Sequence, residues 1–306
     1  MKRTLKIGIA VLIVGLIMVA AGAFTHSFKD VTFNHHGRPE LRTTQTVSKK
    51  VKDFDAISVD LKSDQIRIKE GDTARVQVSS TKKAMPTVRS VGHKLVIEQK
   101  RADNSMTGWS FGDNPEGTFG FGTFYESKHP DRTVVVTVPR GTKLNNISIK
   151  ERQGAIRITD VSADTVSISA HDDVMLEHMT VTQPLKVNSH DGTLYVTGMT
   201  LNTPSIKTDD GAVSLRDVQL NQGSIQLTDG TFNMTNGGFT GAVNVTNDDG
   251  DNEIVNADRN KGYILHGDDE NKLFEQHNEN GGTLQQNETV PDIMHLTTND
   301  GKNSVQ

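Results

Sequence analysis

Cysteine is absent from the 306-residue chain, and aromatic residues make up only 5% of it. Without cysteine there is no disulfide framework, no thiol nucleophile and no cysteine-ligated metal. Hydrophobic residues reach 34%, less than a compact globular protein of this size normally carries. The composition therefore favours a thin, elongated fold in which most residues face water.

A basic surface is also missing. The formal net charge is −5, and the first 24 residues contribute +3 through Lys2, Arg3 and Lys6, so residues 25–306 carry −8. Because nucleic acid needs a cationic surface, we predict no nucleic-acid partner. The chain contains no phosphate-binding loop, dinucleotide fingerprint or serine nucleophile elbow, and we predict that it is not an enzyme.

Long apolar runs are lacking except at the N-terminus. Residues 7–24, IGIAVLIVGLIMVAAGAF, carry no charge and follow the basic segment MKRTLK. About 20 apolar residues cross a bilayer as a helix, and the basic flank is expected to stay in the cytoplasm. Residues 1–24 are thus predicted to be a transmembrane anchor or a signal peptide. The polar residues 25–50 would form a stalk, and the bulk of this single-pass cell-membrane protein would be extracytoplasmic.

A repeated acidic turn divides most of the chain into units of about 19 residues. Its aspartates are Asp172, Asp191, Asp210, Asp229, Asp249, Asp268 and, after a longer interval interpreted as one coil plus an insertion, Asp300. Glycine or aspartate follows each of them. Both residue types tolerate positive φ, so each unit is expected to turn sharply at the same place.

Apolar columns accompany this turn. Four residues before each turn stand Ile149, Ile168, Val187, Ile206, Ile225, Val245, Ile264 and Leu296. Five residues after it stand Ile158, Glu177, Val196, Leu215, Met234, Ile254, Leu273 and Val305. Glu177 breaks the second column, and the neighbouring Leu176 indicates a one-residue register shift. A weaker third column holds Leu201, Leu220 and Phe239.

The alternation within each unit has period two, which is typical of strands. A unit this short cannot bury its own apolar face and must stack on its neighbours. The sequence therefore predicts an all-β fold, a parallel β-solenoid over residues 51–306. Residues 54–80, 93–100 and 132–144 also read as strands, and we expect them to form the first coils or a β cap.

Two segments interrupt the periodicity. Residues 275–292 are a polar insertion, and residues 101–131 are rich in glycine and aromatic residues. The second insertion holds Trp109, Phe111, Phe119, Phe121, Phe124 and Tyr125. These rings are candidates for a binding surface, since exposed aromatics often mark one. Alternatively they are buried against the first coils and protect an open strand edge.

The stretches FDAISVDLKSDQIRIKEGD and VVVTVPRGTKLNNISIKERQGAIRI, with the coils that follow, resemble a bacterial family described as putative adhesins. That family is built on a β-solenoid domain of unknown function (DUF4097-like). The resemblance covers roughly residues 51–306 and implies an envelope protein of the Gram-positive type, some relatives being linked to envelope stress. It implies no catalytic residues.

Two groups of side chains are candidates for metal binding. Carboxylates of Asp191, Asp210, Asp229 and Asp249 would line one edge of the solenoid, where calcium could bridge them, although aspartate is also an ordinary turn residue. His171 and His190 occupy equivalent positions in successive coils, but the column continues with neither histidine nor cysteine. His35 and His36 lie in the stalk. We therefore predict no cofactor, with calcium as the alternative.

These observations lead to a membrane-anchored solenoid that presents a binding surface, as an adhesin or envelope-interaction protein without catalysis. Its expected partners are the membrane, through the N-terminal helix, and a cell-wall polymer or envelope protein. Two alternatives remain open. One is a carbohydrate-active enzyme, since some polysaccharide lyases and hydrolases use β-helices. The other is a calcium-stabilised structural stalk.

Overall fold

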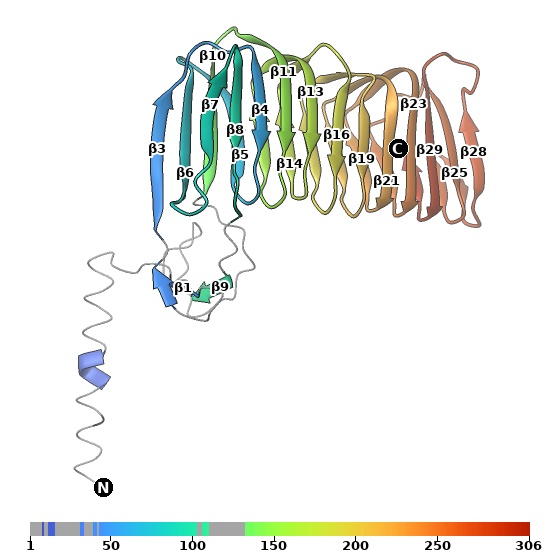
Figure 1. The fold of residues 1–306 in the computed structure, drawn as a ribbon. Helices are drawn as coiled ribbons and strands as arrows, with labels where there is room; N and C mark the ends of the chain where they lie inside the picture. The colour runs from blue at the N-terminus through green and yellow to red at the C-terminus, as the bar shows by residue number, and fades with distance from the viewer. Residues whose placement is uncertain are drawn as a thin grey trace. The chain divides into compact units, whose positions relative to one another are not determined.

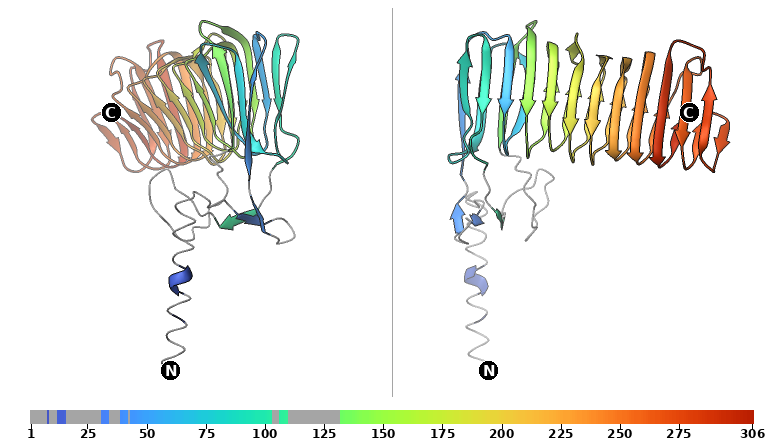
Figure 2. Two further views of the ribbon diagram at one scale, coloured as in Figure 1. Left: turned by 90° about the vertical axis from the view of Figure 1, so that its left-hand side faces the viewer. Right: turned by 45° about the vertical axis from the view of Figure 1, so that its right-hand side comes forward.

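The computed structural model describes residues 43–102, 106–109 and 132–306, together with Gly8 and residues 12–15, 31–33 and 39–41. The chain divides into two compact units. One comprises residues 1–44 and 103–128, and the other comprises residues 45–102 and 129–306. The second unit is a stack of β coils whose strands lie side by side in successive rungs (Figures 1 and 2).

Two large, mainly parallel sheets form the walls of the stack. The first contains, in spatial order, β27 (Gln276–Asn278), β26 (Asn271–Leu273), β30 (Asn303–Val305), β24 (Asn252–Val255), β22 (Phe232–Thr235), β20 (Val213–Arg216), β17 (Leu194–Thr197), β14 (Val174–Glu177), β12 (Ile156–Thr159), β5 (Gln65–Gly71), β10 (Thr133–Pro139), β6 (Arg75–Thr81) and β3 (Thr44–Lys50). We call it the first wall.

The second wall contains, in spatial order, β28 (Gly282–Gln286), β25 (Gly262–Gly267), β29 (Ile293–Asp300), β23 (Gly238–Asp249), β21 (Gln219–Asp229), β19 (Ser205–Thr208), β16 (Leu185–Ser189), β13 (Ser162–Ser169), β11 (Lys143–Lys150), β4 (Ala56–Asp60), β8 (Lys94–Glu98) and β7 (Thr87–Val91). The short strands β15 (Thr180–Val181) and β18 (Thr200–Asn202) pair with β13 and β21. They form a third, narrow side of the coil, which we call the third row.

The predicted apolar columns fill the interior between the walls. Ile149, Ile168, Val187, Ile206, Ile225 and Val245 are register partners from strand to strand. None of these six side chains is more than 2% exposed. Full burial of one such aliphatic side chain stabilises the fold by roughly 1.5–3 kcal/mol. The stacked columns are therefore the main source of stability in a chain with few apolar residues.

The two further column predictions are also confirmed. Leu201, Leu220 and Phe239 are register partners in the third row and are buried. Leu176, not Glu177, aligns with Ile158 and Val196, which confirms the register shift.

The prediction that Ile264 belongs to the first column is wrong by one residue. Leu265 pairs with Leu296 and is fully buried, whereas Ile264 pairs with His295. The cause is the turn that follows. Leu265 is in register with Leu296, and Asn271 is in register with Asn303. The turn from Leu265 to Asn271 is nevertheless one residue shorter than the turn from Leu296 to Asn303. The turn after Ile168 is shortened in the same way. In both shortened turns a second aspartate replaces glycine.

The C-terminal coil is not the last coil of the stack. Strands β29 and β30 lie between β23 and β25, and between β24 and β26, respectively. The segment expected to be one coil plus an insertion begins with the coil of β25 and β26. Strand β27 then pairs antiparallel with β26, and β28 pairs antiparallel with β25. The chain finally returns to form β29 and β30 between this coil and the coil of β23 and β24. A buried ladder supports this order, because Asn252 Nδ2 donates to Asn303 Oδ1 (2.9 Å) and Asn303 Nδ2 donates to Asn271 Oδ1 (2.7 Å).

The N-terminal end is arranged similarly. Strands β4 and β5 form a coil between the coil of β11 and β12 and the strands β8 and β10. Antiparallel strands β6 and β7, with β3 at the margin of the first wall, complete that end. Residues 54–98 therefore supply both a coil and a cap. Strand β3 also extends the first wall seven residues beyond the expected boundary at residue 51.

The Gly/aromatic insertion leaves the solenoid between β8 and β10, where the other coils make their acidic turn. Both ends of this long connection are held by buried polar side chains. Gln99 Oε1 accepts from the amides of Lys62 and Ser63 (2.8 and 2.9 Å), and Arg132 Nη2 donates to the Ser63 carbonyl (2.9 Å). Gln99 and Arg132 therefore bond to the same turn of the solenoid, at residues 62–63.

In the first unit, β1 (Val31–Phe33) pairs with β2 (Pro39–Leu41) and with β9 (Met106–Trp109). The start of the insertion is thus paired with the segment expected to be a polar stalk. Most of residues 1–24, the predicted anchor, lie outside the described residues, although Gly8 and residues 12–15 are helical. Within the described part of the chain, no helix has the length and apolar character to span a bilayer.

Candidate functional site

A hollow opens on the stack where the third row ends. In the preceding coils the row continues from strand to strand, so that Gln219, Leu220 and Asn221 pair with Gly238, Phe239 and Thr240. Beyond them the next strand, β29, pairs with β23 only from Ala242 onward. The segment 258–263 borders the space instead. Gly237 and Gly238 line this space without side chains, and the hollow has a volume of about 340 Å³.

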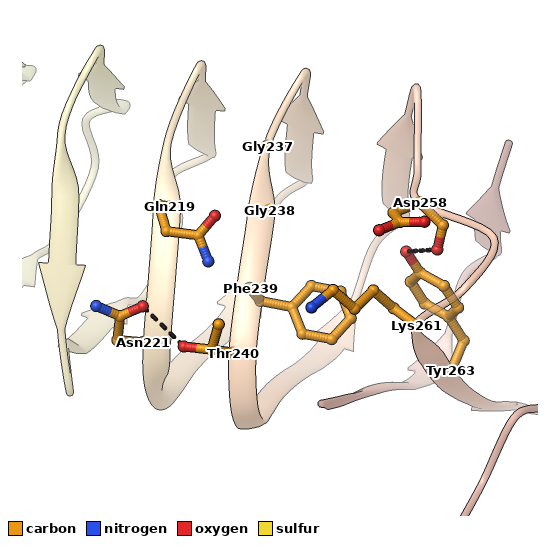
Figure 3. Close-up of a pocket in the computed structure, with 9 residues that line it drawn as sticks. All are labelled: Gln219, Asn221, Gly237, Gly238, Phe239, Thr240, Asp258, Lys261 and Tyr263. Carbon is orange, nitrogen blue, oxygen red and sulfur yellow. Dashed lines mark hydrogen bonds between the residues drawn. The ribbon is translucent and has the colours of Figure 1, made fainter. Parts of the chain in front are cut away.

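Two aromatic rings form the apolar part of this hollow, and polar groups surround them (Figure 3). Phe239 and Tyr263 meet edge to face with ring centroids 5.6 Å apart. The Lys261 ammonium lies 6.0 Å from the centroid of the Phe239 ring. The polar residues that line the hollow are Gln219, Asn221, Thr240, Asp258 and Lys261.

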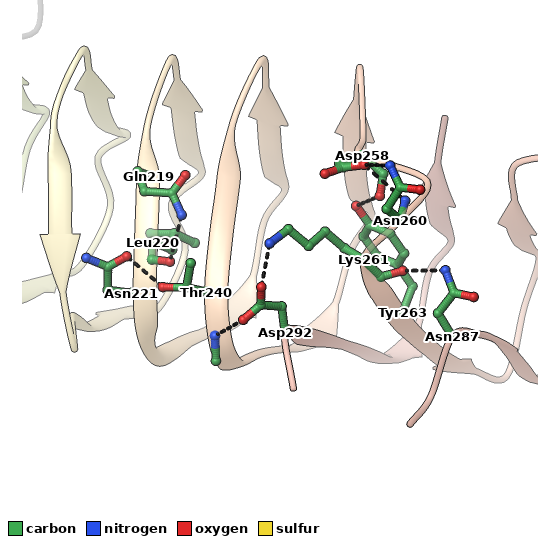
Figure 4. A network of polar contacts seen from close by, with 11 residues as sticks. Gln219, Leu220, Asn221, Thr240, Asp258, Asn260, Lys261, Tyr263, Asn287 and Asp292 are labelled. Carbon is green, nitrogen blue, oxygen red and sulfur yellow. Dashed lines mark hydrogen bonds and ion pairs between the residues drawn. The ribbon is translucent and has the colours of Figure 1, made fainter. Parts of the chain in front are cut away.

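The charged groups around the hollow are held in place by a network (Figure 4). Lys261 Nζ lies 2.5 Å from Asp292 Oδ2, and the other oxygen of Asp292 accepts from the Gly241 amide (2.8 Å). The ion pair with Lys261 keeps the pKa of the Asp292 carboxyl below its usual range. Asp258 accepts from the amide and the side chain of Asn260, which likewise lowers its pKa.

Tyr263 adds a hydrogen-bond donor that does not ionise at neutral pH. Its hydroxyl donates to the Asp258 carbonyl (3.1 Å). Burial, and secondly the nearby Asp258 carboxylate, raises the pKa of the phenol. The hollow thus combines ionised carboxylates, a paired ammonium and neutral donors, and it holds no carboxylic acid suited to donate a proton.

A row of amide and hydroxyl groups leads away from the hollow along the third row. Asn221 Nδ2 donates to Asn202 Oδ1 (2.8 Å), and Thr240 Oγ1 donates to Asn221 Oδ1 (2.8 Å). These three side chains belong to three successive coils. An extended ligand could therefore contact polar groups on several coils at once.

The acidic turns form a second place of interest, which we call the turn edge. There the structure brings together two histidines and one of the predicted aspartates. The rings of His171 and His190 have centroids 5.0 Å apart, and Asp191 Oδ2 lies 3.3 Å from His171 Nε2. One donor atom from each of these three residues lies within 4.8 Å of the others. Asp210, Asp229 and Asp249 are exposed on the following coils and are not part of this group.

The glycines of the turn edge are required by close packing between coils. A Cβ on Gly211 would lie 2.0 Å from the Gly192 carbonyl oxygen, and one on Gly250 would lie 1.8 Å from that of Gly230. The expectation that positive φ explains these glycines is wrong for Gly192 and Gly211, which do not adopt it, and holds for Gly230 and Gly250. Backbone therefore packs directly on backbone at successive turns, and a side chain does not fit between the coils there.

A family model described as Toastrack DUF4097 matches residues 54–306. The chain belongs to the Toastrack DUF4097 family. Membership confirms the resemblance drawn from the strand and turn patterns. The Gram-positive envelope type that the resemblance implies stays a prediction.

The Toastrack chain is also similar to several solved structures. A putative adhesin from Bacteroides fragilis is 14% identical, with 87% of this chain and 98% of that chain covered and a TM-score of 0.46. A putative lipid binding protein from Parabacteroides distasonis is 13% identical, with 86% and 97% covered and a TM-score of 0.44. A putative adhesin from Parabacteroides merdae is 11% identical, with 86% and 96% covered and a TM-score of 0.33. No curated protein matches the chain.

The predicted aromatic surface of the Toastrack chain falls largely outside the described residues. Phe111, Phe119, Phe121, Phe124 and Tyr125 lie there, and of Trp109 only the backbone, at the end of β9, is described. Sequence reasoning overlooked the hollow. Its residues lie in three segments, 219–221, 237–240 and 258–263, that meet where the third row ends, and Gly237-Gly238 was the signal that could have revealed it.

Proposed function

We propose that this protein is a non-catalytic binding protein that holds a hydroxyl-rich segment of a cell-wall polymer in the hollow over Phe239 and Tyr263. The observation that carries the proposal is the combination of an aromatic base, an amide, a hydroxyl, a carboxylate and an ammonium group in one hollow. The volume of about 340 Å³ lies at the lower end of small-molecule sites.

The chemistry of the lining suits a carbohydrate. The Phe239 and Tyr263 rings, 3% and 1% exposed, close the floor of the hollow, so recognition rests on the polar lining. Sugar rings offer hydroxyl groups that both donate and accept hydrogen bonds. Gln219 and Thr240 provide both kinds of partner, Asp258 accepts and Lys261 donates. The row of Asn202, Asn221 and Thr240 would extend recognition along a polymer.

The carboxylates support binding rather than hydrolysis. Glycoside hydrolysis generally uses a pair of carboxyl groups, one of them with a raised pKa so that it can protonate the leaving group. Both carboxyl groups near the hollow, Asp258 and Asp292, have lowered pKa values and are ionised at neutral pH. The hydrolase alternative is therefore the weaker one at this site.

The apolar residues 7–24 and the basic residues before them support attachment to the cell membrane with the solenoid outside. In this arrangement the membrane segment tethers the chain and the stacked coils present the hollow to the wall. Membrane fractions of cells that make the full-length protein should contain it, and protease added outside intact cells should degrade the coils. Protein that resists protease until the cells are lysed would contradict this orientation.

The binding proposal is tested with the full-length protein and purified cell-wall polysaccharide. Gln219→Ala removes a lining amide that makes only one long hydrogen bond, to the Leu220 carbonyl (3.5 Å). We expect up to about tenfold weaker binding, because the hydrogen bond of a buried amide to a ligand is worth roughly 0.5–1.5 kcal/mol.

Gln226→Ala is the matched control, since Gln226 lies on the same strand β21 but is exposed away from the hollow. Its affinity should equal that of the unmodified protein, and no polymer fragments should be released by any of the three. Release of reducing ends by the unmodified protein would overturn the non-catalytic proposal. If both variants bound the polymer as tightly as the unmodified protein, the hollow would not be the binding site. If the protein bound lipid vesicles and no polysaccharide, the ligand would be a lipid and not a cell-wall polymer.

A further inference from the structure

Two imidazoles and a carboxylate converge on the turn edge from successive coils. His171 follows β13, and His190 follows β16 at the equivalent position of the next coil, so that their rings lie 5.0 Å apart and tilted by 40°. Asp191 reaches both rings. Its Oδ2 lies 3.3 Å from His171 Nε2, and its Oδ1 lies 3.8 Å from His190 Nδ1.

The backbone beneath these side chains is fixed. The Asp191 amide donates to the His171 carbonyl (3.0 Å), and the Asp210 amide donates to the His190 carbonyl (2.7 Å). A Cβ on Gly192 would lie 2.1 Å from the Asp172 carbonyl carbon, so the turn is pressed against the coil before it. The side chains are half exposed and can adjust, whereas their Cα atoms keep their positions.

We propose that His171, His190 and Asp191 form a zinc-binding site on the turn edge. Zinc in proteins commonly takes imidazole nitrogen and carboxylate oxygen at about 2.0–2.2 Å in a tetrahedron, which places ligand atoms about 3.3–3.5 Å apart. The observed separation of 3.3 Å already fits, and the others, within 4.8 Å, require small rotations of exposed side chains. Three protein ligands leave the fourth position open.

The donor set distinguishes zinc from calcium. Calcium takes six to eight oxygen ligands, and only one carboxylate belongs to this group. Imidazole nitrogen is instead a preferred donor for zinc and neighbouring transition metals. The group of His171, His190 and Asp191 therefore does not suit calcium, which the column of aspartates had suggested as the alternative.

The next coil supplies an outer partner. Asp209 Oδ2 lies 3.0 Å from His190 Nδ1, and Lys207 Nζ lies 3.7 Å from Asp209 Oδ1. Because the contact with Asp209 occupies Nδ1, His190 would bind zinc through Nε2. A carboxylate bonded to the other nitrogen of a ligating imidazole orients the ring and typically contributes 10–100-fold to metal affinity. Zinc would thus join two coils directly, with a third coil supporting the ring.

The test uses the full-length protein freed of metal by a chelator. Titration with Zn²⁺ by calorimetry should show a site that takes one ion, and Co²⁺ in its place should give the visible absorption bands of tetrahedral coordination. His171→Ala and His190→Ala should each weaken Zn²⁺ binding at least about tenfold. Circular dichroism should be unchanged, because both side chains are about half exposed.

Two controls separate this site from other histidines. His178 faces a single carboxylate, with Nδ1 3.7 Å from Asp160 Oδ1 and a similar exposure; His178→Ala should leave Zn²⁺ affinity unchanged. The pair His35→Ala with His36→Ala should also retain the site. The proposal is overturned if Zn²⁺ affinity survives in the His171→Ala, His190→Ala double variant, or if it is lost only when His35 and His36 are replaced.

Discussion

Glu151 gives the sharpest test of the interior beneath the turn edge. It is 2% exposed, in the position that holds Ser189 and Thr208 in later coils. One of its oxygens accepts from the Gln153 amide (2.7 Å), and the other, Oε2, is buried without a hydrogen bond. Burial is the main cause that raises the pKa of this carboxyl from 4.5 to about 8, with the Asp172 charge adding to it.

The sign of the pH dependence follows from this shift. Below pH 4.5 Glu151 is protonated in both the folded and the unfolded chain, and it contributes no pH-dependent term. Between pH 4.5 and about 8 the unfolded chain loses the proton while the folded chain keeps it. Stability therefore falls as pH rises through this window, by up to about 1.4 kcal/mol per pH unit. The total is a few kcal/mol, a large share of the 5–15 kcal/mol typical of a domain.

Glu151→Gln removes the titration while keeping the size of the side chain and the acceptor for Gln153. Urea unfolding of the full-length protein, followed by circular dichroism between pH 5 and 8.5, measures the free energy of unfolding of both proteins. Near pH 5 the variant should be equally or less stable, because the new amide hydrogens are buried. Near pH 8.5 it should be the more stable one by a few kcal/mol. Parallel curves for the two proteins would refute the assignment of the raised pKa to Glu151.

Two further predictions concern the stacking of coils. Gly211→Ala should lower the free energy of unfolding by roughly 1–3 kcal/mol, because the added Cβ would meet the Gly192 carbonyl at 2.0 Å; an unchanged melting temperature would contradict the close-packed turn. The order of the last coils can be read by cross-linking, since the chain has no cysteine of its own. Thr246→Cys with Thr297→Cys should form a disulfide, because these residues are register partners, whereas Thr246→Cys with His266→Cys should not, because β29 separates them. The opposite outcome would place β25 next to β23.

The columns were predictable because burial imposes the same residue type at the same point of every coil. Val187 and Ile206 could be aligned from spacing alone, and they are register partners. Spacing fails where a turn changes length, and for this reason Ile264 was assigned in place of Leu265. It also cannot order the coils. Leu265 and Leu296 are equally suited to pack on Val245, and only the buried asparagine ladder and the path of the chain distinguish them.

The candidate sites were predictable to different degrees. Equivalent positions of His171 and His190 followed from the repeat, but their convergence with Asp191 depends on side-chain directions that the spacing does not specify. The hollow arises where the repeat stops, from three segments about one coil length apart in sequence, and a periodic pattern does not show that the third row ends there. Gly237-Gly238, a place without side chains beside Phe239, was the local indication.

The measurement that tests polymer binding in the hollow most directly is residue-resolved hydrogen exchange of the full-length protein with and without cell-wall polysaccharide. The account predicts slower exchange of the backbone amides in residues 237–240 and 258–263 when polymer is present. The amides of β14 and β17, in earlier coils of the first wall, should exchange at nearly the same rate with and without polymer. Protection confined to other segments, such as β9 in the Gly/aromatic insertion, would contradict it.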